Sequence, residues 1–225
     1  ETFYIYKGGE GTEGSSIAPA NVSHVTVDLS VKVIGRYAFI GCHELASVLI
    51  PEGVEVIGER AFFGCSELTA MELPSTLKEI RDDAFQNCGE LVSIVIPEGV
   101  ELVGDFAFHD CSKLAMVELP ATITQIQQHS FSDCEELTAI VVPKGVKVVG
   151  ESAFCNCTNL VKVELPSTLQ TIEKEAFYNC SSSLSIKVPE GTEEIGSEAF
   201  YACVNLEEVE LPTTTTLKVI GDEAF

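Results

Sequence analysis

Residues 57–79 read IGERAFFGCSELTAMELPSTLKE, and units of this kind follow one another along most of the 225-residue chain. Cysteine recurs with a step of 23 residues, and one phenylalanine and one proline per unit keep the same step. The periodic cysteines are Cys42, Cys65, Cys88, Cys111, Cys134, Cys157, Cys180 and Cys203. Three residue types locked to one step are typical of a repeat protein, in which each unit stacks on its neighbours and the stack shares one core.

The second half of the unit predicts a short β-strand. Met71 and Leu73 alternate with Ala70 and Glu72, which is the two-residue period of a strand that is buried on one side only. One such strand cannot bury its apolar side alone. We therefore expect the strands to stack in parallel, with hydrogen bonds that run from unit to unit.

The first half of the unit must return the chain across the opposite side. Ala61-Phe62 and Cys65 predict a single tight helical or 3-10 turn whose Phe and Cys side chains face inward. The residue before each periodic cysteine is Gly, Asn or Asp in every unit but one, and these residues tolerate a left-handed backbone. We expect this position to end the turn, with Ala202 as a strained exception.

A second period lies on top of the first. After the periodic proline, sequences such as Glu52-Gly53-Val54 alternate with sequences such as Ser75-Thr76-Leu77. This alternation predicts that the 23-residue repeats are arranged in pairs, and that the pair is the unit that was duplicated.

These residues resemble the BspA-type (Treponema pallidum-type) leucine-rich repeat, and the resemblance covers nearly the whole chain. It implies a leucine-rich-repeat solenoid: a right-handed, curved superhelix with a parallel β-sheet on its concave face and short helical or 3-10 turns opposite. Residues 25–225 form the expected repeat domain of about eight to nine repeats, truncated at its C-terminus, and residues 1–24 an N-terminal capping segment. Ser183 replaces the leucine of earlier units, which predicts a looser repeat there. The resemblance also implies a secreted or cell-surface protein, often one that adheres to host proteins or cells.

The charge of the chain narrows the classes of partner. Lys and Arg number 13 against 35 Asp and Glu, which gives a formal net charge of −22. Such a chain is repelled by phosphate backbones and anionic lipids, so we do not expect a nucleic acid partner. No stretch of the sequence is long and apolar enough to span a bilayer, so we expect no membrane insertion of these residues. No signal peptide or membrane anchor is visible, and both ends resemble cuts in a longer chain, so this absence has no weight for its localisation.

Nine cysteines first suggest zinc or disulfides, but eight of them occupy one position of successive repeats. Zinc ligands must converge on one point from several directions, and a column of equivalent side chains cannot do so. We therefore predict a stack of buried thiols that act as small hydrophobic residues. Cys155 lies outside the column, at a position that accepts many residue types, and we expect an exposed free thiol there.

No arrangement of residues predicts catalysis, a metal site or a cofactor. The four histidines occupy four different positions of the repeat, so we expect solvated surface histidines rather than a catalytic triad; they are His24, His43, His109 and His129. Phosphate-binding loops and hydrolase motifs are absent from the sequence. Asn21-Val22-Ser23 is the one sequon that does not follow from the repeat itself, and it would accept a glycan in a secreted eukaryotic protein.

The outward residues of the predicted strands suggest a binding surface. Glutamate recurs in every second strand, at Glu72, Glu118 and Glu164, with apolar residues in the strands between. The predicted partner-binding residues on the concave face are Ser47, Leu49, Ala70, Glu72, Ser93, Val95, Met116, Glu118, Ala139, Val141, Lys162 and Glu164. The simpler interpretation is a solvated sheet whose spaced charges prevent edge-to-edge pairing. Calcium binding by these acids is disfavoured, because no dense cluster of oxygen ligands forms.

Two hypotheses follow for the function. The first is a non-enzymatic, cell-surface or secreted adhesion module whose concave sheet binds a protein or glycoprotein, for example in extracellular matrix or on a host cell. The alternative is a structural spacer or scaffold in a larger surface protein, with no ligand of its own.

Overall fold

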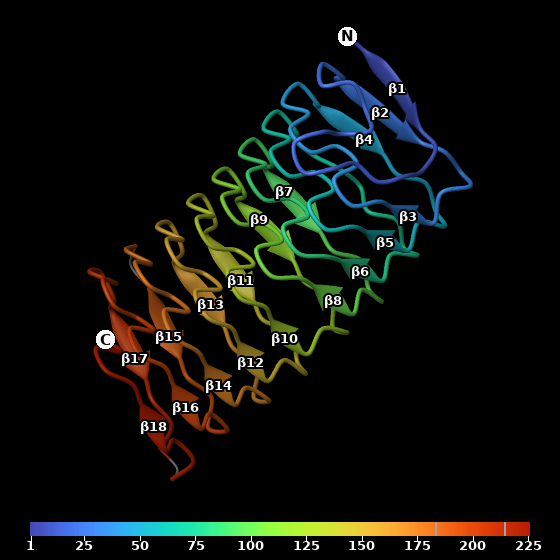
Figure 1. Ribbon diagram of the computed structural model, residues 1–225. Helices are drawn as coiled ribbons and strands as arrows, with labels where there is room; N and C mark the ends of the chain where they lie inside the picture. Colours follow the sequence, from blue (N-terminus) through green and yellow to red (C-terminus); the bar gives the residue numbers. More distant parts are fainter. Residues whose placement is uncertain (183, 214) are drawn as a thin grey trace.

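The computed structural model describes residues 1–182, 184–213 and 215–225, and over these residues the chain forms a parallel β-solenoid of about nine coils (Figure 1). Each coil contributes a strand to one or both of two rows that run side by side along the solenoid, and then returns through a run of turns. The predicted solenoid of 23-residue repeats is therefore confirmed. The looser repeat expected at Ser183 lies outside the described residues, although the next residue, Leu184, is fully buried.

The first row holds the longer strands. They are β1 (Phe3–Tyr6), β2 (His24–Val27), β4 (Ser47–Leu49), β7 (Ser93–Val95), β9 (Met116–Glu118), β11 (Ala139–Val141), β13 (Lys162–Glu164), β15 (Ser185–Lys187) and β17 (Glu208–Glu210). This row is divided into three hydrogen-bonded sheets, in the orders β1-β2-β4, β7-β9 and β11-β13-β15-β17. Strand β1 pairs in parallel with β2, whereas the division into a capping segment and a repeat domain stays a prediction.

The second row holds strands of two residues. They are β3 (Val33–Ile34), β5 (Val56–Ile57), β6 (Glu79–Ile80), β8 (Leu102–Val103), β10 (Gln125–Ile126), β12 (Val148–Val149), β14 (Thr171–Ile172), β16 (Glu194–Ile195) and β18 (Val219–Ile220). They form two parallel sheets, in the orders β3-β5-β6-β8 and β10-β12-β14-β16-β18. The second residue of each of these strands up to β16, such as Ile57 or Val149, is buried in the core, whereas Ile220 of the last strand, β18, is 49% exposed.

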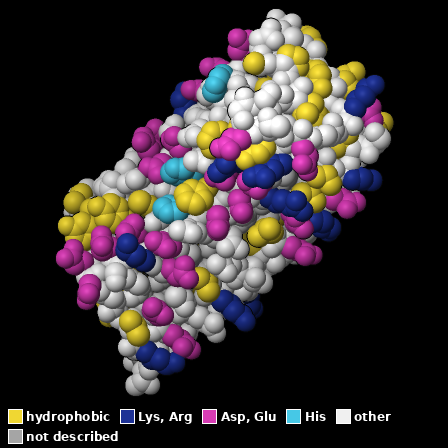
Figure 2. Space-filling model, in the orientation of Figure 1, with side chains coloured by type: hydrophobic (Ala, Val, Ile, Leu, Met, Phe, Trp, Pro, Cys, Tyr) yellow, Lys and Arg dark blue, Asp and Glu magenta, His cyan; other side chains and the backbone are white. Residues whose placement is uncertain are grey.

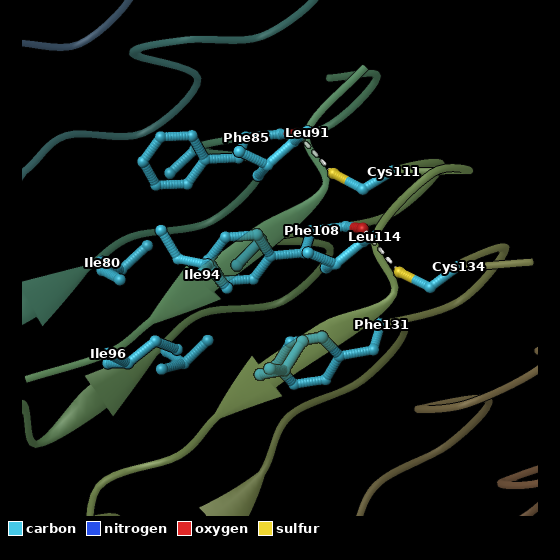
Figure 3. Packing of buried hydrophobic residues seen from close by; sticks show 14 of the residues in the cluster. Ile80, Phe85, Leu91, Ile94, Ile96, Phe108, Cys111, Leu114, Phe131 and Cys134 are labelled. Atoms are coloured by element: carbon cyan, nitrogen blue, oxygen red, sulfur yellow. Dashed lines mark hydrogen bonds between the residues drawn. The ribbon is translucent and has the colours of Figure 1, made fainter. Parts of the chain in front are cut away.

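The core is built from columns of identical side chains, one from each coil (Figure 3). The rings of Phe85 and Phe108 stack with their centroids 5.2 Å apart and their planes 7° from parallel. Beside them, the Cys111 thiol donates a hydrogen bond to the Phe85 carbonyl over 3.2 Å. Burial raises the pKa of the Cys111 thiol well above its usual value, so the thiol keeps the proton that it donates. All eight periodic cysteines are buried and unbridged, as predicted.

The return segments are not the helical or 3-10 turns that the sequence predicts, because no helix occurs among the described residues. Amide N–H groups along each segment point alternately in two directions. The Phe62 N–H donates to the Ala84 carbonyl of the next coil over 2.8 Å, while the Ala61 N–H closes a turn on the Gly58 carbonyl. A helix would direct every N–H back along its own segment. Here half of them link neighbouring coils instead, as a third ladder.

Two left-handed residues in each coil create this third ladder. The predicted one, directly before each periodic cysteine, is confirmed even at Ala202, whose φ is 58°. The second lies four residues earlier, at positions such as Arg60 and Phe106, and it was not among the positions predicted from the sequence. The residue types at this second position are diverse and include neither glycine nor asparagine, so they give no local signal for a left-handed backbone.

The two-coil period corresponds to hydrogen bonds made within each pair. The Thr76 hydroxyl donates to the Val54 carbonyl over 2.7 Å and accepts from the Gly53 N–H over 2.9 Å. The Glu52 carboxylate also accepts from the Ser75 N–H over 3.1 Å. Thr122 and Thr168 repeat the carbonyl contact in the next two pairs. Alternating Gly and Thr are therefore complementary partners in adjacent coils.

Candidate binding face

We call the outward side of the first row the strand face; it also includes the Ala70–Glu72 segment, which lies between β4 and β7 in sequence. All twelve predicted site residues lie on this face. Eleven are exposed and Ser93 is half-buried, whereas the alternating inward residues, such as Ile94 and Val117, are buried. The two-residue period of the sequence thus predicted the orientation of these side chains correctly. Partner binding by them stays a prediction.

One column of the strand face alternates between apolar and acidic side chains along the solenoid. Leu49, Val95 and Val141 expose 65%, 51% and 58% of their surface, and Glu72 and Glu118 are exposed between them. Exposed apolar side chains mark an interaction surface when they lie close together on one face. The spaced carboxylates make this column negatively charged, and a partner with basic residues would be complementary to it.

Two hollows lie on the strand face. The larger, of ≈ 850 Å³, contains six of the predicted residues in its lining: Ser47, Leu49, Ala70, Glu72, Ser93 and Val95. The smaller, of ≈ 490 Å³, contains Met116, Glu118, Ala139 and Val141. Lys162 and Glu164 line neither hollow. The two-residue period of the sequence predicts that the lining residues share one face, but it gives no indication of the two hollows.

Both hollows lie where hydrogen bonding between neighbouring coils is interrupted. Among the described residues, 70–73 make no backbone hydrogen bond to the coil on either side. Likewise, β9 and β11 belong to different sheets. The inward residue Met71 still packs in the core, so this part of the chain remains attached by its side chains. The interrupted ladder leaves the backbone polar groups of residues 70–73 without a bond to a neighbouring coil, beside exposed apolar side chains such as Leu49 and Val95.

The acids of the strand face differ in their partners. Glu164 pairs with Lys162 of the same strand over 2.6 Å, and Glu210 pairs with Lys187 of the neighbouring strand. Across the part of the chain that the structure describes, Glu72 and Glu118 form no ion pair. Ser47 is also engaged, because its hydroxyl lies 2.7 Å from His24 Nδ1. The free carboxylates of this column are therefore at the two hollows.

The expectations for Cys155, which lies in the return segments that we call the turn side, and for the histidines are wrong. Cys155 is half-buried instead of exposed, and burial, with Asp133 and Glu175, raises the pKa of its thiol to about 11. A thiol of this pKa is almost wholly protonated at neutral pH, which makes it a poor nucleophile.

The histidines also differ from the solvated side chains that we expected, since His43 alone is exposed. His129 stacks on Phe106 with ring centroids 4.5 Å apart, and His109 lies 3.4 Å from the Asp133 carboxylate. Burial is the main cause that lowers the pKa of His129, and the nearby His109 is the second. In the described ranges, no three His, Cys, Asp or Glu side chains gather closely enough to hold a metal ion. Those ranges also contain no helix that could cross a membrane.

The coil geometry, the buried Leu-Phe-Cys columns and the exposed strand face define a leucine-rich repeat protein, a class that serves for protein interaction or as a scaffold. The BspA type leucine rich repeat region matches residues 31–161 and 124–225, in six copies. The chain therefore belongs to this family, which is generally non-enzymatic. No curated protein matches the sequence.

Solved structures of similar proteins come from bacteria. A leucine-rich repeat protein from Bacteroides ovatus is 28% identical with a TM-score of 0.74, and the alignment covers 91% of this chain and 64% of that protein. The T. pallidum leucine rich repeat protein is 26% identical with a TM-score of 0.55, and the alignment covers 92% of this chain and 72% of that one. The chain thus spans less than two thirds of the length of the Bacteroides protein.

Proposed function

We propose that this chain is the non-enzymatic recognition module of a secreted or cell-surface protein, and that its strand face binds a protein or glycoprotein of the extracellular matrix or of a cell surface. The observation that carries this proposal is the larger hollow, where Leu49 and Val95 are exposed over an interrupted ladder. Covering such side chains stabilises a complex by about 25 cal/mol for each Å² of apolar surface removed from water.

A spacer is the rival function, and the strand face argues against it. A spacer needs only a stable core and a solvated surface, and the turn side and the buried columns already supply the stability. Exposed apolar side chains lie at several places on the molecule (Figure 2), and four of them, Leu49, Val95, Met116 and Val141, line the two hollows. Such side chains lower the solubility of a chain with no ligand, and a partner that covers the hollows would explain these four.

A capture experiment with matched variants tests this proposal. The variant Leu49→Asp, Val95→Asp changes the larger hollow of the strand face, and the control Leu29→Asp, Val204→Asp makes the same change of charge at side chains that are 79% and 77% exposed elsewhere. Matrix and cell-surface extracts are passed over each immobilised protein. We expect a protein to be retained by the wild type and the control variant, and lost by the strand-face variant.

A second arm distinguishes the spacer. Removal of residues 93–138 deletes one pair of coils and joins equivalent positions of the repeat. A spacer keeps its role when shortened, whereas the recognition module loses affinity because part of both hollows is removed. Retention of the same proteins by all variants would contradict binding by the strand face.

A further inference from the structure

The two ends of the strand face differ in charge. At the N-terminal end, β1, β2 and β4 form one hydrogen-bonded sheet (Figure 1), and its outward side chains form two columns, Phe3-His24-Ser47 and Ile5-Thr26-Leu49. None of these six is Asp, Glu, Lys or Arg, in a chain with 35 acids. Toward the other end, the outward residues of β13, β15 and β17 are Lys162, Glu164, Ser185, Lys187, Glu208 and Glu210. We call the outward side of β1, β2 and β4 the uncharged end.

Large apolar side chains are exposed at the uncharged end. Phe3, Ile5 and Leu49 expose 74%, 59% and 65% of their surface, and they lie within three successive strands of one sheet. Leu49 also lines the larger hollow, so the uncharged end continues into it. Apolar side chains gathered in this way on one face are typical of an interaction site.

Side-chain contacts hold the first column in place. The Phe3 ring stacks on the His24 ring, with centroids 4.9 Å apart and planes 23° from parallel. His24 Nδ1 in turn lies 2.7 Å from the Ser47 hydroxyl. The Phe3 ring is therefore ordered before a partner arrives, which reduces the entropy lost on binding.

The second column has a short side chain between two longer apolar ones. Paired parallel strands are about 4.8 Å apart, so Ile5 and Leu49 are about 9.6 Å apart, with the exposed Thr26 between them. Carbon atoms pack at about 3.5–4.0 Å, so a side chain that contacts both neighbours spans about 7–8 Å. One aromatic ring or branched aliphatic side chain placed over Thr26 can therefore contact Ile5 and Leu49 together.

Charge determines what lies beside such an anchoring side chain. Glu72 follows Leu49 in the second column, and it forms no ion pair among the described residues. A basic group of the partner is favoured next to this carboxylate. A second copy of the chain is a poor occupant, because each copy has a net charge of −22 and the two repel each other.

We propose that the uncharged end anchors the partner protein: a large neutral side chain, aromatic or branched aliphatic, packs over Thr26 between Ile5 and Leu49, and a neighbouring lysine or arginine pairs with Glu72. This inference rests on the proposed function, because it names the chemistry of the partner that the same face takes. It adds to the predicted partner-binding residues Phe3, Ile5, His24 and Thr26.

Three capped peptides test the anchor by NMR titration of the 15N-labelled chain. They are N-acetyl-Trp-Gly-Lys-amide, N-acetyl-Trp-Gly-Glu-amide and N-acetyl-Ala-Gly-Lys-amide. We expect both tryptophan peptides to shift the amide signals of residues 3–5, 24–26 and 47–49, and the alanine peptide to leave them unchanged. The Lys form should bind roughly two- to fivefold more tightly than the Glu form, which is the size of one exposed ion pair.

Matched variants locate the two contacts. Ile5→Ala, Leu49→Ala should weaken binding of the tryptophan peptides roughly three- to tenfold, because it removes apolar surface from both sides of Thr26. Leu29→Ala, Val204→Ala truncates side chains that are exposed elsewhere and should leave binding unchanged.

A second pair of variants tests the acid. Glu72→Gln should abolish the preference for the Lys peptide over the Glu peptide. Glu101→Gln makes the same change of charge at an exposed position directly before β8, and should preserve the preference.

Absent shifts, shifts centred elsewhere, or binding that survives Ile5→Ala, Leu49→Ala would overturn the anchor. Equal affinity of the wild type for the Lys and Glu peptides would overturn the basic neighbour. Self-association in sedimentation equilibrium that is lost in Ile5→Ala, Leu49→Ala would assign this surface to a second copy and would also overturn the inference. Failure of the peptides together with capture that depends on Leu49 and Val95 would refute the anchor alone and leave the proposed function supported.

Discussion

The turn side and the strand face of the solenoid are held together in different ways. On the turn side, the N–H groups of Phe62, Phe85 and Phe108 each donate to the next coil over 2.8–2.9 Å, and this ladder continues through every coil with a following neighbour. On the strand face, the ladder is interrupted on both sides of Ala70–Glu72 and between β9 and β11. The turn side thus keeps the coils in register, and the strand face can be open where a partner is expected.

The largest expected effect is a loss of stability after a substitution on the turn side, which carries the continuous ladder. Phe108→Ala removes a ring stacked between Phe85 and Phe131, and we expect a loss of about 3–5 kcal/mol in the free energy of unfolding. Met71→Ala, beneath the interrupted ladder, should cost less, because loosely held chain can relax into the cavity. Urea denaturation followed by circular dichroism measures both. A greater loss at Met71 would contradict this assignment of stability.

The bonds within coil pairs provide the next test. Thr76→Val keeps the side-chain shape but removes the hydroxyl that bridges Val54 and Gly53, so we expect a loss of about 1–2 kcal/mol in the free energy of unfolding. Thr138→Val, at an exposed position, serves as the control. Equal stability of the two variants in urea denaturation would remove the physical basis for the paired repeats.

One substitution can lengthen the column of unpaired acids on the strand face. Lys162→Ala releases Glu164 from its ion pair and lengthens the column of free acids by two coils. We expect about twofold tighter binding of a short oligolysine peptide, in line with one additional exposed ion pair. Lys113→Ala, which removes a lysine paired with Glu90 and causes the same change of charge, is the control. An equal gain from both variants would indicate a general effect of net charge.

The smallest effect is a dependence on pH. Hydrogen bonds from the Ser75 N–H and hydroxyl lower the pKa of the Glu52 carboxyl below its usual 4.5. A group with a lowered folded pKa stabilises the folded state above its unfolded pKa, and that stabilisation is lost as the pH falls through the folded pKa. Glu52→Gln should therefore lower Tm at pH 7, and the difference from wild type should shrink below about pH 4.5. A difference that stays constant from pH 7 to pH 3 would show that ionisation of Glu52 has no part in it.

Residue periodicity predicted much of this molecule. The 23-residue step predicted that the phenylalanines and cysteines lie in the core. The alternation along Ala70, Met71 and Glu72 predicted correctly that Met71 faces inward and that its two neighbours face outward. Glycine and asparagine before the cysteines identified one left-handed position. These features are local, or repeat identically, so each coil supplies independent evidence for them.

The remaining features depend on contacts between coils. The left-handed backbone at Arg60 or Phe106 follows from the ladder to the next coil, and these residue types give no local signal for it. Ala70–Glu72 has the same apolar pattern as strands that do pair, so nothing in the sequence marks the interruption. The neutralisation of Glu164 likewise depends on the rotamer of Lys162, which spacing alone cannot predict.

Amide hydrogen exchange resolved to single residues tests the central claim most directly, because it compares the two sides in one unmodified protein. Buried, bonded amides exchange slowly, and amides without a partner exchange fast. We predict strong protection of the Phe62 and Phe85 amides and fast exchange of the amides of residues 70–73. Protection of residues 70–73 equal to that of Phe62 and Phe85 would show a closed ladder, and would contradict the open strand face on which the binding proposals depend.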